Sequence, residues 1–101
     1  MPKLHVSVPH TLPQQEARER LIRFVDLLRA NYGNQVSDLE QSWEDDTLRF
    51  QFKTYGFQLA GRVTVTDHAL DAHGELPFSA VIFRHKIESA IREQLTRLVA
   101  S

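Results

Sequence analysis

Residues 36–76 read VSDLEQSWEDDTLRFQFKTYGFQLAGRVTVTDHALDAHGEL. Apolar and polar side chains alternate along most of this stretch, a period of two that is typical of strands with one buried face. Short polar segments interrupt the alternation at residues 44–47, 54–56 and 67–68. Connections this short join antiparallel neighbours, so we expect four strands in a meander.

One face of this meander is apolar. We expect it to carry Leu39, Trp43, Leu48, Phe50, Phe52, Phe57, Leu59, Val63, Val65, Leu70, Ala72 and Leu76. Arg49, Gln51 and Lys53 alternate with these residues and are expected on the opposite, solvated face.

An earlier strand and a helix precede the meander. Residues 4–8 alternate in the same way and predict a short strand, which Pro9 ends. Thr11 and Gln14 have the spacing of a capping box and predict the start of a helix. Its apolar stripe comprises Ala17, Leu21, Phe24, Val25 and Leu28, and residues 31–34, with Gly33, are expected to close it.

A second amphipathic helix is predicted after Pro77, with Ser79 as its cap, and it is expected to run to the C-terminus. Its stripe comprises Phe83, Ile87, Ala90, Ile91 and Leu98, with Leu95 beside it. Gln94 is a polar residue near the centre of the stripe. The prediction is therefore a single α+β domain over residues 1–101, in the order β-α-β-β-β-β-α, with both helices covering one face of the antiparallel meander.

Composition excludes several kinds of protein. The chain has 101 residues, no cysteine, and a net charge of -1 from 12 basic and 13 acidic residues. Thiolate metal sites and cysteine nucleophiles are therefore excluded, and the mixed charges do not favour nucleic-acid binding. We find neither a secretory signal nor about 20 consecutive apolar residues, so we expect no membrane span and a cytoplasmic location.

No cofactor or metal site is predicted. The five histidines lack the helical spacing of zinc hydrolases, and we expect them at the surface. Asp45 and Asp46 are interpreted as turn residues rather than cation ligands. Phosphate-binding loops and nucleophile elbows are absent from the sequence, so we do not expect an enzyme.

An alternative is a small hydrophobic-ligand binder or enzyme, with a pocket between the curved sheet and the C-terminal helix. Trp43, Tyr55 and His73 are the candidate residues at its mouth. Core packing is the simpler interpretation of Trp43, because its alternation places it with Leu39.

The run from Leu76 to Phe83 has more apolar side chains than one helix face can bury. Ile82 falls among Lys86, Ser89 and Glu93 on a helical projection. Either another part of the chain covers Ile82, or Phe78, Val81 and Ile82 form an exposed surface for a partner, a granule or a second copy. A homo-oligomer through this surface or through a sheet edge is a further possibility.

The chain resembles the family of polyhydroxyalkanoic acid system proteins, small bacterial proteins associated with storage-polyester granules. The resemblance rests on residues 1–6 and 9–12, on WEDDTLRF at 43–50, on GRVTVTD at 61–67, and on Lys86, Ile87, Glu88 and Ile91 in the closing helix. The chain departs from the family pattern at residues 78–83. The resemblance implies a role at or near the granule and no catalytic residues. We therefore expect a non-enzymatic accessory protein that binds a granule surface or a granule-associated protein.

Overall fold

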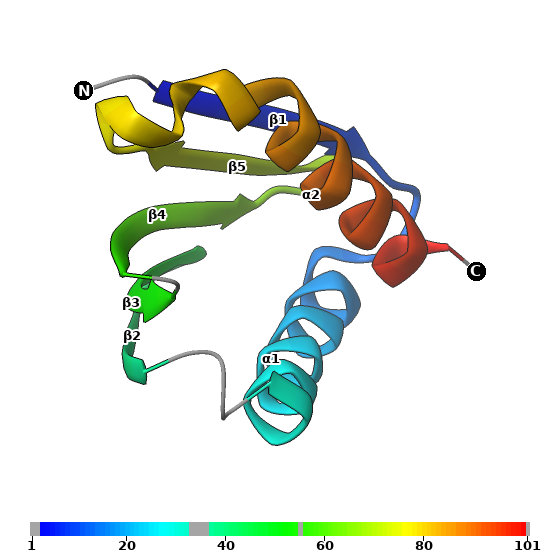
Figure 1. Cartoon of the computed structure of the whole chain (residues 1–101). Helices are drawn as coiled ribbons and strands as arrows, with labels where there is room; N and C mark the ends of the chain where they lie inside the picture. Colours follow the sequence, from blue (N-terminus) through cyan, green and yellow to red (C-terminus); the bar gives the residue numbers. More distant parts are fainter. Residues whose placement is uncertain (1–2, 33–36, 55, 101) are drawn as a thin grey trace.

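The computed structural model describes residues 3–32, 37–54 and 56–100. Within these residues, five strands form one antiparallel sheet, accompanied by two α-helices and a 3₁₀ helix (Figure 1). In chain order the elements are β1 (Lys3–Pro9), α1 (Gln14–Tyr32), β2 (Ser37–Glu44), β3 (Thr47–Thr54), β4 (Phe57–Val65), β5 (Ala69–Glu75), η1 (Phe78–Phe83) and α2 (Arg84–Val99). The predicted α+β class and the order β-α-β-β-β-β-α are confirmed.

The sheet has the strand order β1-β5-β4-β3-β2. Strands β2 to β5 form the predicted meander, each antiparallel to the next. Strand β1 joins β5, with Val6 opposite Ala72 and Val8 opposite Leu70. This register places the alternating apolar residues of β1 on the same face as those of β5 and extends the apolar surface by one strand.

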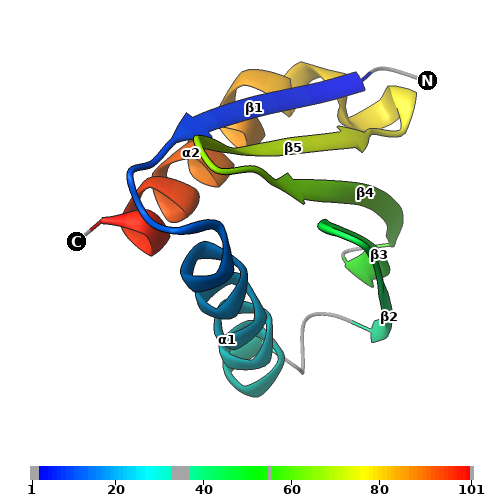
Figure 2. The same ribbon diagram turned by 180° about the vertical axis from the view of Figure 1, so that it is seen from behind.

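Both helices pack on this apolar face (Figures 1 and 2). The core cluster combines buried side chains from every layer: Val6, Val8, Leu48, Val63, Val65 and Leu70 from the strands, Ala17 and Leu21 from α1, and Leu95 and Val99 from α2. The opposite face of the sheet has no helix over it in the described part of the chain, and its side chains are mainly polar or charged. We call these two surfaces the inner face and the outer face.

The segment after Pro77 differs from the prediction of one continuous helix. Residues Phe78–Phe83 form the 3₁₀ helix η1, and α2 begins only at Arg84. Pro77 precedes η1 and no side-chain cap is present there, so the predicted capping role of Ser79 is wrong. Because a 3₁₀ helix turns about 120° per residue rather than 100°, Phe83 is rotated out of the predicted core stripe and is 52% exposed. Gln94 is exposed and needs no internal partner.

The start of α1 also differs from the prediction. Its first hydrogen bond runs from the Ala17 N–H to the Pro13 carbonyl, at 3.0 Å. The Gln14 side chain donates to the Val65 carbonyl on β4 at 2.8 Å, so it anchors the helix to the sheet instead of closing a capping box with Thr11. Of the predicted end of this helix, Asn31 and Tyr32 are still helical, whereas Gly33 and Asn34 lie outside the described residues, as does the side chain of Leu28.

The residues Asp45 and Asp46 form the turn between β2 and β3, as predicted. Asp45 has a φ of 54°, in the left-handed region that aspartate enters more readily than most residues. The carbonyl of Asp46 accepts the backbone N–H of Val65 at 2.8 Å, which ties this turn to the end of β4.

His10 is a buried polar residue, which contradicts its predicted surface position. Its Nδ1 accepts the Leu12 N–H at 3.1 Å, and its Nε2 donates to the Thr66 carbonyl at 2.9 Å. Its backbone N–H donates to the His68 carbonyl at 2.8 Å. His10 therefore fastens the link between β1 and α1 to the turn between β4 and β5, and both of its ring nitrogens have partners.

We predict that His10→Ala lowers the free energy of unfolding by about 1–3 kcal/mol, because it leaves the Leu12 N–H and the Thr66 carbonyl without partners. Urea denaturation at neutral pH measures this change. The control is His68→Ala, which removes an exposed side chain and should change stability by no more than about 0.5 kcal/mol. A similar change in both variants would refute the anchoring role of His10.

Candidate interaction surface

Four large apolar side chains of η1 are exposed together. Their exposed fractions are 72% for Phe78, 38% for Val81, 81% for Ile82 and 52% for Phe83. We call these four residues the η1 patch. The sequence left open whether Ile82 is covered by another part of the chain or exposed. In the structure it is exposed.

The η1 patch is held in place by its buried neighbours. Leu76, just before η1, and Ala80, within it, are 1% and 6% exposed, so both are buried. The Ala80 N–H donates to the Pro77 carbonyl at 3.0 Å. Because η1 follows β5 directly, the patch lies at the end of the sheet where β1 begins, as Figure 2 shows. The patch is therefore carried on a backbone that is anchored to the core.

The concentration of apolar residues here is unusual for a small protein. Isolated exposed apolar side chains are common, whereas neighbouring ones often mark an interaction site. Elsewhere in the described residues, the exposed large apolar side chains are Ile22 and Leu27, both on α1. Sequence analysis identified Phe78, Val81 and Ile82 but placed Phe83 in the core, because its pattern did not reveal the 3₁₀ geometry.

The candidate ligand-binding residues are not brought together. Trp43 lies on the inner face, where its ring packs against the core. The guanidinium carbon of Arg18 lies 4.5 Å from the centre of this ring, in cation–π geometry. The Arg18 Nη1 also donates to the Asp45 carbonyl at 3.1 Å and lies 3.7 Å from the Asp46 carboxylate. Arg18 thus occupies one face of the indole and ties α1 to the turn between β2 and β3.

His73 lies on the outer face, across the sheet from Trp43. Its ring stacks against that of His5 with a centroid distance of 4.3 Å. Both ring nitrogens are shielded from solvent and have no hydrogen-bond partner among the described residues. Tyr55 lies outside the described residues. A shared pocket mouth formed by Trp43 and His73 is not present.

Partial burial lowers the pKa of His73 from its ordinary value of 6.5. The positive charges of Arg62, His5 and Lys3 lower this pKa further, whereas the carboxylate of Asp71 raises it. Asp71 itself accepts a hydrogen bond of 2.7 Å from the Ser7 hydroxyl. The surroundings of His73 on the outer face therefore favour its neutral form.

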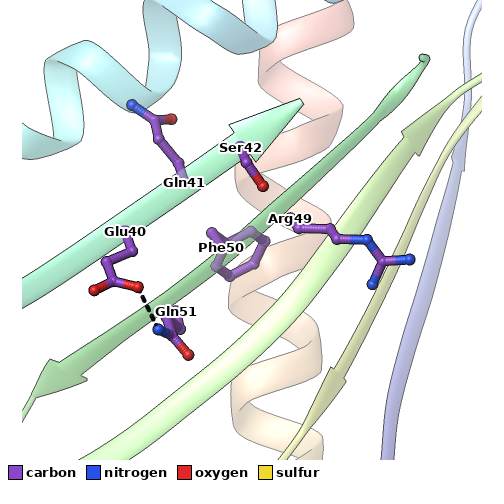
Figure 3. A pocket seen from close by; sticks show the side chains of 6 residues that line it. All are labelled: Glu40, Gln41, Ser42, Arg49, Phe50 and Gln51. Carbon is purple, nitrogen blue, oxygen red and sulfur yellow. Dashed lines mark hydrogen bonds between the residues drawn. The ribbon is translucent and has the colours of Figure 1, made fainter. Parts of the chain in front are cut away.

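Two open depressions follow β2 and β3. The first has a volume of about 240 Å³ and is lined by Glu40, Gln41, Ser42, Arg49, Phe50 and Gln51 (Figure 3). A hydrogen bond of 2.6 Å from the Gln51 amide to the Glu40 carboxylate crosses it. The second has a volume of about 380 Å³ and is lined by Asp38, Leu39, Glu40, Gln51, Phe52, Lys53 and Gln58. Neither is lined by α2, Trp43 or His73, and both are more open and polar than most small-molecule sites.

Within residues 3–32, 37–54 and 56–100, no three histidine, aspartate or glutamate side chains come close enough to hold a metal ion. None of the helices described is both long and apolar enough to cross a membrane.

The fold and its surface define a small α+β protein with an exposed apolar patch at one end of its sheet. The chain belongs to the family described as "Putative polyhydroxyalkanoic acid system protein", whose model matches residues 4–99. The resemblance found in the sequence is thus confirmed, and the chain is related to the polyhydroxyalkanoic acid system.

Comparison with solved structures finds TTHA0849 from Thermus thermophilus, which is 12% identical. The match covers 96% of this chain and 91% of that one, with a TM-score of 0.44. No curated protein matches the chain significantly.

We predict that His73 makes the protein less stable as the pH falls from about 7 to about 5. The unfolded chain takes up a proton near the ordinary histidine pKa, whereas folded His73 takes it up only at lower pH, so acid favours the unfolded state in this window. Urea denaturation at both pH values should show a smaller acid-induced loss for His73→Gln than for the unchanged protein. His85→Gln, which replaces an exposed histidine on α2, is the matched control. Equal pH dependence in the two variants would argue against this role of His73.

Proposed function

We propose that the protein is a non-enzymatic accessory protein of storage-polyester metabolism that attaches to the granule surface through the η1 patch. The supporting observation is the exposure of Phe78 and Ile82, at 72% and 81%, next to the anchored residues Leu76 and Ala80. Family membership supplies the polyester context, and the patch supplies a surface that can meet an apolar material. In this role it acts in the cytoplasm as a single domain.

The size of the patch supports weak, reversible attachment. Burying one large apolar side chain contributes roughly 1.5–3 kcal/mol, so Phe78 and Ile82 together contribute about 3–6 kcal/mol. This range corresponds to dissociation constants from several millimolar to some tens of micromolar, before any cost of immobilisation. Val81 and Phe83 add apolar area at the same place. A granule surface offers many equivalent positions, so attachment of this strength can hold a substantial fraction of the protein.

We predict that Ile82→Asp reduces co-sedimentation with isolated polyhydroxyalkanoate granules several-fold. An aspartate at position 82 cannot make the apolar contact with the granule, and its carboxylate would lose its hydration there. The stability of the fold should change little, because Ile82 is 81% exposed. The matched control is Leu27→Asp, which introduces the same charge at a 59% exposed apolar residue on α1. Helix α1 lies apart from η1 in both views (Figures 1 and 2).

Circular dichroism should first establish that both variants are folded. Leu27→Asp should then co-sediment as the unchanged protein does. If Ile82→Asp and the unchanged protein co-sediment with granules to the same extent, the η1 patch is not the contact surface. Failure of the unchanged protein to bind granules would refute the proposed function itself. Binding only in the presence of other granule proteins would identify a protein partner instead.

A further inference from the structure

Three basic residues follow the η1 patch without interruption. Arg84, His85 and Lys86 are the first three residues of α2, and all three are exposed. The Nε of Arg84 lies 3.9 Å from the Glu88 carboxylate, a long contact, and neither His85 nor Lys86 forms an ion pair with a described residue. We call these three residues the basic turn.

The helix dipole does not explain the basic turn at the start of α2. The N-terminal end of a helix carries partial positive charge, which favours acidic side chains in the first turn. The first turn of α2 contains no acidic residue. The described contacts within the chain give Lys86 no compensating interaction, so its position is not explained by the stability of α2.

The nearest acid on α2 is directed toward the sheet. Only 16% of the Glu88 side chain is exposed, and its Oε2 accepts the backbone N–H of His5 on the free edge of β1, at 3.3 Å. On the neighbouring strands, Lys3 lies opposite Glu75, so these two charges offset each other. The basic turn is therefore the exposed excess of charge beside the η1 patch.

We propose that the η1 patch and the basic turn together form a docking element for an anionic phospholipid surface. This inference rests on the proposed function and specifies the surface that the patch meets. Proteins that lie in a lipid interface combine apolar or aromatic side chains at the boundary of the acyl chains with Lys and Arg at the level of the phosphates. Phe78, Ile82 and Phe83 precede Arg84 and Lys86 closely in the chain, and all five are exposed, which provides both kinds of side chain at one end of the molecule.

The shape of the surface favours a lipid layer over an acidic protein. Ile82 is 81% exposed and Phe78 is 72% exposed, so these side chains project from the surface instead of lining a groove. A fluid layer can close around a projecting side chain, whereas a protein partner needs a matching cavity. Each basic residue near an anionic layer contributes roughly a fivefold increase in binding, and added salt screens this contribution.

The test uses the full chain and sedimented vesicles of two compositions, phosphatidylcholine alone and phosphatidylcholine mixed with phosphatidylglycerol. The unchanged protein should bind the mixed vesicles, release them at high salt, and bind the neutral vesicles several-fold less. Lys86→Glu and Ile82→Asp should each lower binding to the mixed vesicles several-fold. The control Arg23→Glu makes the same charge change on the exposed surface of α1 and should bind normally.

Thermal unfolding separates a binding role of Lys86 from a structural one. Because an acidic residue is favoured at the start of a helix, Lys86→Glu should unfold at a temperature no lower than that of the unchanged protein. Weaker binding by an equally stable variant supports the proposal. Equal binding of Lys86→Glu and Arg23→Glu overturns it, as does equal binding to both kinds of vesicle.

The two proposals can fail separately. In one outcome, the unchanged protein binds granules, Ile82→Asp does not, and neither protein binds the mixed vesicles. The contact is then with polyester, and only the lipid inference is overturned. Capture by an acidic protein on the granule, without vesicle binding, also overturns it. If the mixed vesicles are bound and the granules are not, lipid docking is supported and the granule function is refuted.

Discussion

Burial of the apolar inner face of the sheet against two helices holds this structure together. The strands bring Val6, Val65 and Leu70 to one surface, and each of these side chains is at most 1% exposed. Neither helix covers this surface alone: α1 contributes Ala17 and Leu21, and α2 contributes Leu95 and Val99. Since the hydrophobic effect scales with the apolar area removed from water, the sheet and both helices depend on one another for stability.

This packing also explains why η1 is left outside the core. Strand β5 ends at Glu75, at the beginning of β1, and α2 returns along β1, so that Leu95 and Val99 join the core cluster. The six residues of η1 make that reversal. Leu76 and Ala80 are buried at this reversal, whereas Phe78 and Ile82 are mostly exposed. The η1 patch therefore lies at the chain reversal between β5 and α2.

The sequence predicts the sheet better than the surface, for physical reasons. Period-two alternation depends on the local backbone, so the meander and the inner position of Trp43 follow from it. The start of the second helix cannot be predicted in this way, because the pattern of residues 78–83 is compatible with either α or 3₁₀ geometry. The burial of His10 depends on the distant turn at Thr66 and His68, which no local pattern reveals. His73 is different: its alternation with Leu70 and Ala72 already indicated the outer face, and the pocket hypothesis disregarded that signal.

The exposed side chains of Phe78 and Ile82 and the basic turn contribute little to the stability of the fold. Phe78 and Ile82 are 72% and 81% exposed and so bury little apolar area, and the first turn of α2 has no acidic residue to complement the helix dipole. Neither feature is needed for the chain reversal, since Ala80 and Leu76 already anchor it. Natural proteins commonly retain such locally unfavourable residues where binding requires them. Two features with independent energetic origins, one apolar and one electrostatic, occupy consecutive residues at one end of the molecule. The chain reversal accounts for the position of the η1 patch, whereas an external surface that is both apolar and anionic accounts for the apolar residues found there and for the basic residues that follow them.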